Sequence, residues 1–164
     1  MAAGKGTPVS VAQRLEELGI EIPPPPPPVG MYRAALRSGN WLMVSGQLPM
    51  RDGELVNPGH VRGDDDIDAG REAARVATLN ALSAVQALHG SLEGLRVVRL
   101  VGYVASAPDF AAHPAVINAA SELLLDLFGE DAGLGTRLAM GVAALPLGAA
   151  VEIDLILEDM EAAA

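Results

Sequence analysis

Apolar residues recur along the chain with two different spacings, and these separate strands from helices. Short runs rich in Val, Leu and Ile predict strands, whereas longer Ala- and Leu-rich runs with a helical period predict helices. The predicted strands are residues 32–36, 41–45, 97–105, 137–144 and 151–157. The predicted helices run from Asp64 to about Leu88, where Gly90 closes the helix, and from His113 to about Phe128. The order β-β-α-β-α-β-β predicts an α+β domain.

Turn-forming residues mark the connections between these elements. Residues 37–40 read Arg-Ser-Gly-Asn and predict a tight hairpin turn between the first two strands. Residues 48–64 are rich in Pro, Gly, Asn and Asp and predict a loop with a short strand near Leu55. Residues 145–148, with Pro and Gly, predict that the last two strands form an antiparallel hairpin.

The N-terminal segment predicts a small appended helix followed by a rigid strap. Ser10 can cap a short helix with an apolar stripe, and Gly19 can end it. Residues 23–28 are all proline, which requires an extended, polyproline-like chain. We therefore divide the chain into residues 1–28, helix and strap, and residues 29–164, the main domain. Since the strap separates the helix from the domain, removal of residues 1–22 is expected to leave the core folded.

Both faces of the predicted sheet carry apolar residues. In residues 41–44 and 97–101 aliphatic or aromatic side chains occupy alternating positions on either side of the strand. Two helices can cover only one face of such a sheet. We therefore expect the other face to pack against further copies of the chain in a closed cyclic oligomer.

The acidic balance of the chain argues against several classes of partner. Its 164 residues include 21 Asp and Glu against 11 Lys and Arg, for a formal net charge of -10. Affinity for nucleic acids and anionic membranes comes largely from basic side chains. Aromatic residues make up only 3% of the chain, too few for a base-stacking surface. Without cysteine, signal peptide or membrane span, the pattern predicts a cytoplasmic protein without nucleic-acid or membrane partners.

Known cofactor and metal motifs do not match. The acidic run at residues 64–68 lacks the Gly and Glu spacing of a calcium loop, and it suits a helix start instead. His60, His89 and His113 are too far apart in the sequence for a zinc site. The glycines after residue 128 are not followed by the Lys of a phosphate-binding loop. We therefore predict neither a metal ion nor a cofactor.

Arg137 and Glu152 are charged residues placed inside apolar strand segments. Charges in such positions are unfavourable unless they are paired or used. One interpretation is a structural ion pair between the two. The other is a binding site in which Arg137 holds an anionic substrate through two parallel hydrogen bonds while Glu152 works on water.

These residues also carry a family resemblance. An Arg, eight residues and a Pro, followed by a strand with a Val-Glu-Ile triplet, stand here as Arg137, Pro146 and residues 151–153. This pattern resembles the C-terminal signature of the Rid family, the reactive intermediate deaminases, also called the YjgF family. Further similarities are Gly30-Met31-Tyr32, Val44-Ser45-Gly46-Gln47 and Asp109-Phe110 followed by Asn118.

The resemblance implies a chorismate-mutase-like fold, a mixed sheet with two helices on one face, assembled as a homotrimer with clefts between subunits. It implies that Arg137 binds the carboxylate of a 2-imino or enamine acid and that Glu152 directs the attacking water, without cofactor. Tyr32, Ser45 and Asn118 are the implied pocket residues. Two departures stand out: Ala139 occupies a position that is often Cys, and residues 112–115 form an apparent insertion.

Three functions follow from these observations. The favoured one is hydrolytic deamination of imino or enamine acids to 2-keto acids and ammonia. An alternative is a non-catalytic trimer that binds a small carboxylate-bearing ligand in the same cleft. A third is a structural or protein-interaction role that uses the proline run, because proline-rich segments dock on aromatic grooves. The retained Glu152 favours the first, since binding alone has less need of it.

Overall fold

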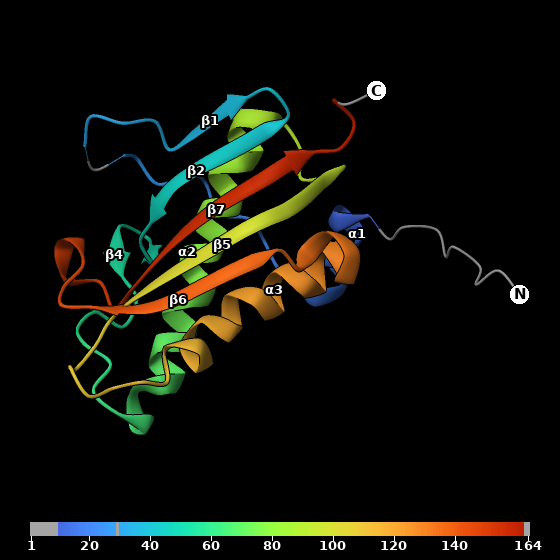
Figure 1. The fold of residues 1–164 in the computed structure, drawn as a ribbon. Coiled ribbons are helices and arrows are strands. Elements are labelled where there is room, and N and C mark those ends of the chain that lie inside the picture. The colour runs from blue at the N-terminus through green and yellow to red at the C-terminus, as the bar shows by residue number, and fades with distance from the viewer. Residues whose placement is uncertain (1–9, 29, 163–164) are drawn as a thin grey trace, which may run out of the picture.

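Two long helices cover one face of a five-stranded sheet in the computed structural model, which describes residues 10–28 and 30–162 (Figure 1). The helices are α1 (Val11–Leu18), α2 (Ile67–His89) and α3 (His113–Gly133), with short 3-10 turns η1 (Asp64–Asp66) and η2 (Pro146–Gly148). The strands are β1 (Ala35–Ser38), β2 (Trp41–Gln47), β3 (Met50–Arg51), β4 (Glu54–Leu55), β5 (Leu95–Ala105), β6 (Thr136–Val142) and β7 (Val151–Asp159). The α+β prediction and the order of its elements are confirmed. No helix of the described residues combines the length and the apolar character of a membrane span.

The strand order of the main sheet is β1-β2-β7-β5-β6, and β3 pairs with β4 in a separate small hairpin. β6 runs parallel to β5, and all other pairs are antiparallel, so the sheet is mixed. The predicted hairpin of the last two strands is wrong. β5 lies between β6 and β7, because the α3 crossover places β6 at the sheet edge and β7 fills the space between β2 and β5. Residues 143–150 therefore cross the end of β5 instead of making a tight turn.

The helix ends follow the predicted capping residues. Oγ of Ser10 accepts a hydrogen bond from the backbone N–H of Gln13, and Gly19 ends α1 with φ 62°. Gly90, with φ 91°, ends α2. The longer α3 is interrupted at Gly129, where φ is 77°, so its regular part ends at the predicted Phe128.

The N-terminal helix packs on the domain, so the strap does not separate it from the core. Val11 is only 5% exposed and belongs to the main core, and Leu15, Ile20 and Ile22 pack against the same core. The carboxylate of Glu93 accepts hydrogen bonds from the N–H groups of Val11 and Ala12 at 3.1 and 2.9 Å. The start of α1 is thus bound by an acidic side chain that follows α2, about 80 residues later in the chain.

The proline run lies along α2. Oγ of Ser83 donates a hydrogen bond to the carbonyl of Pro23 at 2.5 Å. Pro23 and Pro26 are partly buried, whereas the other prolines of the run are exposed. The two partly buried prolines are three residues apart, and this spacing is the period of a polyproline helix that lies with one edge against the protein.

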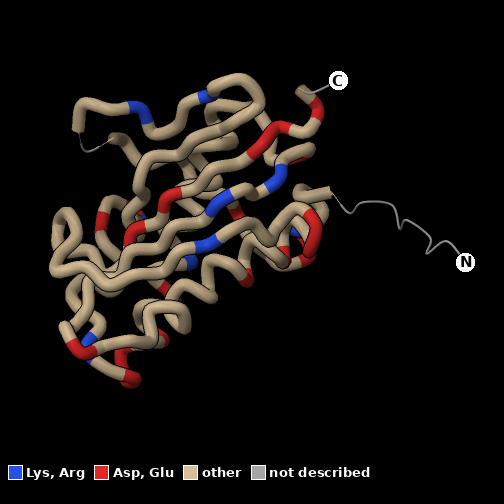
Figure 2. The backbone as a smooth tube through the Cα atoms, viewed as in Figure 1, with Lys and Arg blue, Asp and Glu red and all other residues tan. Residues whose placement is uncertain are grey.

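The two faces of the sheet differ sharply in burial. On the helix side, alternate residues of β7 such as Ile153, Leu155 and Leu157 are fully buried. The opposite face, called here the open face, carries large apolar side chains that remain about 40% exposed, among them Trp41, Met43, Leu138 and Met140. The charged residues of the three central and edge strands are divided by strand instead: arginines lie on β5 and β6, and acidic residues lie on β7 (Figure 2).

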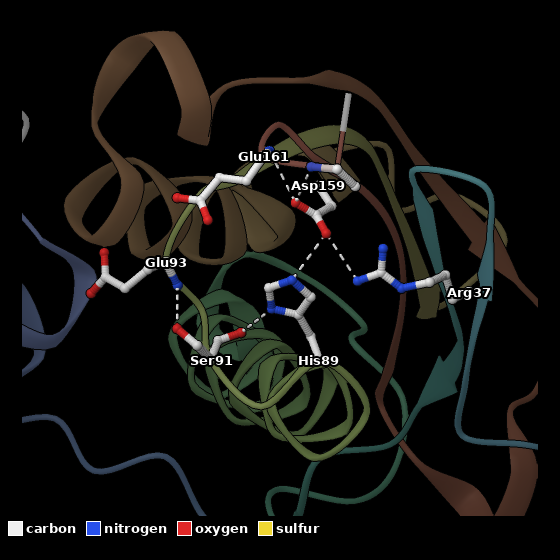
Figure 3. Close-up of polar contacts among 7 residues, drawn as sticks. Arg37, His89, Ser91, Glu93, Asp159 and Glu161 are labelled. Atoms are coloured by element: carbon white, nitrogen blue, oxygen red, sulfur yellow. Dashed lines mark hydrogen bonds and ion pairs between the residues drawn. The ribbon is translucent and has the colours of Figure 1, made fainter. Parts of the chain in front are cut away.

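Asp159, at the end of β7, joins three parts of the fold (Figure 3). Its carboxylate accepts hydrogen bonds from Arg37 of β1 at 2.9 Å and from His89 of α2 at 3.2 Å, and also from the N–H groups of Glu161 and Ala162. The Arg37 guanidinium is the main cause that lowers the pKa of Asp159 to about 2. This carboxylate therefore stays charged and fixes the C-terminal turn to the first hairpin.

Candidate functional site

Arg137 and Asn118 lie together where the edge strand β6 faces α3. Nη1 of Arg137 donates hydrogen bonds to Oδ1 of Asn118 at 2.7 Å and to Oγ of Ser121 at 3.1 Å. Asn118 and Ser121 are three residues apart on α3, so both reach the same nitrogen. Arg137 and Asn118 are exposed, and these contacts leave Nε and Nη2 of the guanidinium to other partners. The edge thus presents an exposed arginine that is held through one nitrogen, and a guanidinium of this kind can bind a carboxylate through its other donors.

Glu152 lies elsewhere, against the backbone of β2. The pairing of β2 with β7 is irregular between Val44 and Gln47, as at a β-bulge. A β-carbon on Gly46 would lie 2.0 Å from Oε1 of Glu152, so the glycine makes room for the carboxylate. The buried side chain of Gln47 donates to the carbonyl of Ser45 at 3.0 Å. This contact holds the irregular segment in place beside Glu152.

The surroundings of Glu152 alter its acidity. Burial raises the pKa of Glu152, and the negative charge of Asp154 raises it further. Burial also raises the pKa of Asp154, against the opposing charge of Arg99. A carboxylate with a raised pKa accepts a proton from water more readily than an ordinary surface glutamate does. Glu152 is therefore suited to act as a base.

Tyr32 and Ser45 line a shallow groove of about 340 Å³ beside β1 and β2. Oγ of Ser45 donates to the carbonyl of Arg33 at 2.7 Å, and Met43 of the open face is also part of the groove wall. Tyr32 is 43% exposed. Because Ser45 adjoins Gly46, this groove lies close to Glu152.

Arg137 and Glu152 project from opposite faces of the sheet. Arg137 pairs with Leu100 of β5, and Glu152 pairs with Tyr103 of the same strand. A β-carbon on Gly102 would meet Ile117 of α3, so Leu100 and Gly102 face the helices and the odd-numbered Tyr103 faces away. Paired residues share a face, which places Arg137 on the helix side and Glu152 on the open face. The two form no ion pair among the described residues, and the structural-pair interpretation is therefore wrong.

The five predicted site residues thus fall into two half-sites within one chain. The first, the arginine half-site, contains Arg137 and Asn118. The second, the glutamate half-site, contains Glu152, Ser45 and Tyr32. A separate hollow of about 450 Å³, near His60 and Arg62, contains none of these residues. No group of three or more His, Asp or Glu side chains within residues 10–28 and 30–162 is arranged to hold a metal ion.

Comparison with known proteins identifies the family. The model of the family described as "YjgF/chorismate mutase-like, putative endoribonuclease" matches residues 12–158. The chain belongs to this family. Its five-stranded mixed sheet with α2 and α3 on one face is the chorismate-mutase-like fold of the YjgF proteins.

Similar proteins align with most of this YjgF-family chain. Protein TCP17 of Trypanosoma cruzi is 42% identical over 149 residues, which are 90% of this chain and 93% of the relative. The protein Atu1372 from Agrobacterium tumefaciens, a protein of unknown function, is 42% identical, and its crystal structure covers 92% of both chains with a TM-score of 0.80. RidA from an Antarctic Psychrobacter is 28% identical, covers 82% of this chain and 93% of its own, and has a TM-score of 0.58.

Sequence reasoning missed three residues that build the half-sites of this YjgF-family chain. Ser121 holds Arg137 together with Asn118, and its spacing on a predicted helix is the signal that could have indicated it. Gly46 and Gln47 belong to the Ser-Gly-Gln motif, but their contacts with Glu152 and Ser45 depend on strand pairing. No local pattern reveals which strands pair.

Proposed function

We propose that the chain is a hydrolytic deaminase of reactive 2-imino and enamine acids that works in clefts between the subunits of a homotrimer. The observation that carries the proposal is the division of the site: a held arginine on the helix side and a half-buried glutamate with a raised pKa on the open face. Neither half-site contains both groups that the reaction needs. In the trimer, the arginine half-site of one subunit would lie beside the glutamate half-site of its neighbour.

The open face supports such an assembly. Trp41, Met43, Leu138 and Met140 leave a broad apolar surface that includes both the β2 side and the β6 edge of the sheet. Contiguous exposed apolar surface of this kind is typical of a protein interface. Cyclic closure would bring the β6 edge of one copy to the β2 side of the next, which is how one chain type can complete both half-sites.

The proposed chemistry assigns a separate role to each half-site. Nε and Nη2 of Arg137 bind the carboxylate of the imino acid, and Asn118 keeps the guanidinium in place. Glu152 takes a proton from water, whose oxygen bonds to the imine carbon and gives a tetrahedral carbinolamine. Glu152 returns this proton to the nitrogen, then takes the proton of the carbinolamine hydroxyl and passes it to the same nitrogen. As the hydroxyl becomes a carbonyl, the carbon–nitrogen bond breaks, ammonia leaves and a 2-keto acid remains. Tyr32 and Ser45 would contact the rest of the substrate.

The test generates 2-aminoacrylate or 2-iminobutyrate with an amino-acid dehydratase and follows release of the keto acid. Wild-type protein should accelerate release. Arg137→Lys should lower the rate by about 10-fold or more, because an ammonium cannot reproduce the two parallel bonds of the guanidinium. Glu152→Gln should lower it by roughly 100-fold, the lower range of a general-base contribution.

Arg96→Lys is the matched control, because Arg96 is another exposed sheet arginine and pairs with Glu158 outside the site. It should keep the wild-type rate. Binding of keto acids by a stable wild-type trimer that does not accelerate hydrolysis would replace the deaminase with a non-catalytic binding protein. Cleavage of RNA by the purified protein, abolished in Glu152→Gln, would favour the nuclease description of the family; the net charge of -10 argues against that outcome.

The proposal places the protein in the cytoplasm. The sequence contains no cysteine, and the reaction uses metabolites of amino-acid chemistry. Fractionation of cells that express the tagged chain tests this location.

A further inference from the structure

The groove beside β1 and β2 is lined by one charged side chain, that of Arg33. None of the other residues that line this hollow of about 340 Å³ is Asp, Glu, Lys or Arg. Arg33 is exposed, and no ion pair or hydrogen bond within residues 10–28 and 30–162 occupies its guanidinium. The donors of this guanidinium are therefore available to a ligand in the groove.

The backbone of Arg33 is fixed to β2. Oγ of Ser45 donates a hydrogen bond to the carbonyl of Arg33 at 2.7 Å, and the N–H of Ser45 donates to the carbonyl of Ala34 at 2.9 Å. Both bonds start from the residue before Gly46, the glycine that makes room for the carboxylate of Glu152. Arg33 therefore has a fixed place in the glutamate half-site, from which its guanidinium can reach a substrate.

An apolar wall belongs to the same groove. Leu36 and Met43 pair across β1 and β2, and both line the groove together with Arg33. Their side chains are 47% and 43% exposed on the open face. Ligand sites are commonly apolar with a small number of placed polar or charged groups. A groove with apolar walls and a single guanidinium suits a short carbon chain that ends in an anion.

We infer that Arg33 determines specificity for imino acids that carry a second carboxylate at the end of the side chain. The inference rests on the proposed function, because it takes Arg137 of the neighbouring subunit as the anchor of the first carboxylate. The carbon chain of the substrate then lies along Leu36 and Met43, and the guanidinium of Arg33 binds the second carboxylate. An imino acid without that carboxylate gains nothing from Arg33. The water attack remains with Glu152.

The test measures binding of two stable keto acids of equal chain length, 2-oxoglutarate and 2-oxovalerate, to the full-length protein by calorimetry. Wild-type protein should bind 2-oxoglutarate about 10-fold more tightly, because 2-oxovalerate lacks the carboxylate that accepts a charge-assisted hydrogen bond. Arg33→Gln removes the charge. It should abolish the preference and leave binding of 2-oxovalerate within about twofold. At about 1 M salt the wild-type preference should shrink, since Arg33 is exposed and its charge is screened.

Two further variants separate Arg33 from other arginines of the chain. Arg51→Gln, at an exposed arginine of β3 outside the groove, should keep the preference for 2-oxoglutarate. Arg137→Lys should weaken binding of both acids, because each of them carries the first carboxylate.

Equal affinities of wild type for the two acids, no measurable binding of 2-oxoglutarate, or an unchanged preference in a folded Arg33→Gln protein would overturn the inference. Dissociation of the Arg33→Gln protein relative to wild type would assign the guanidinium to a subunit contact and overturn it as well. A dicarboxylate preference in a protein that accelerates no hydrolysis would overturn the deaminase and leave this inference standing. Hydrolysis of the imines of both acids without any preference for the dicarboxylate would do the reverse.

Discussion

At the scale of single residues, the two charged groups of the site differ in what holds them. Arg137 is exposed and held from one side by two polar side chains of α3. Glu152 is half buried and lies on the backbone of a glycine in a different strand. Because neither charge depends on the other, removal of one leaves no unpaired buried partner. The stability effects of variants at the two positions should therefore be small.

Gly46→Ala is expected to remove activity without unfolding the protein. Its new methyl group would lie 2.0 Å from Oε1 of Glu152, which must rotate away. The end of a glutamate side chain moves easily, so the free energy of unfolding should change by about 1 kcal/mol or less. Hydrolysis rate and thermal melting, measured on the same preparation, check this.

Gly63→Ala is the matched glycine control, because Gly63 has an extended φ of -173° and nothing within 4 Å of a β-carbon. Wild-type activity in both alanine variants would show that the position of Glu152 does not matter.

The raised pKa of Glu152 predicts a pH profile. Activity should rise with pH as Glu152 loses its proton, and the midpoint should lie above the ordinary glutamate value of 4.5. Folding stability should change in the opposite direction: because the folded pKa is raised, wild type loses some stability as pH rises from 4.5 through the folded pKa. Glu152→Gln lacks this loss, so the stability difference between it and wild type should shift in its favour over that window. A pH series of chemical unfolding for both proteins measures the difference.

At the scale of elements, α1 belongs to the core that it adjoins. Val11 is 5% exposed, and Val11→Ala should lower the free energy of unfolding by about 1–3 kcal/mol. For a chain of this size the melting temperature should fall by about 2–4 °C for each kcal/mol. Leu18→Ala, at a position 44% exposed on the same helix, should change little. Equal melting temperatures for wild type and Val11→Ala would show that α1 is not part of the folded unit in solution.

The hydrogen bonds of Asp159 with Arg37 and His89 predict how the stability of the fold depends on pH. Because the pKa of Asp159 is lowered to about 2 from 3.8, its charge stabilises the fold above pH 3.8, and this contribution is lost as pH falls toward 2. Asp159→Asn should therefore be less stable than wild type at neutral pH, and the difference should shrink below pH 3.8. Asp126→Asn, at an exposed position of α3, should show no such difference in the same unfolding series.

At the scale of the whole molecule, the open face should be the interface between subunits. The proposed trimer has a mass of about 51 kDa, three times the 16.9 kDa of the chain. Met43→Glu places a charge on the open face and should yield monomers by light scattering, with loss of hydrolysis because the half-sites separate. Leu125→Glu, at a similarly exposed position on α3, should leave the mass unchanged. A wild-type protein that stays monomeric at micromolar concentration would contradict the assembly.

The sequence by itself determined the elements and the residue types of the site. Hydrophobic spacing predicted α2, α3 and the five main strands, and Ser10, Gly19 and Gly90 were recognisable helix ends. These features depend on contacts within a few residues, which is why a local pattern encodes them. The Arg137, Pro146 and Glu152 motif likewise indicated the family that the comparison established.

Only the tertiary structure decided how those parts meet. The insertion of β7 between β2 and β5 separates the last two strands, which local turn chemistry predicted as neighbours. That insertion sets which residues of β5 pair with Arg137 and Glu152, and hence that the two side chains leave opposite faces of the sheet. Strand order and register depend on pairing between segments far apart in the chain and on the space that α3 leaves open. No periodicity within one segment contains that information.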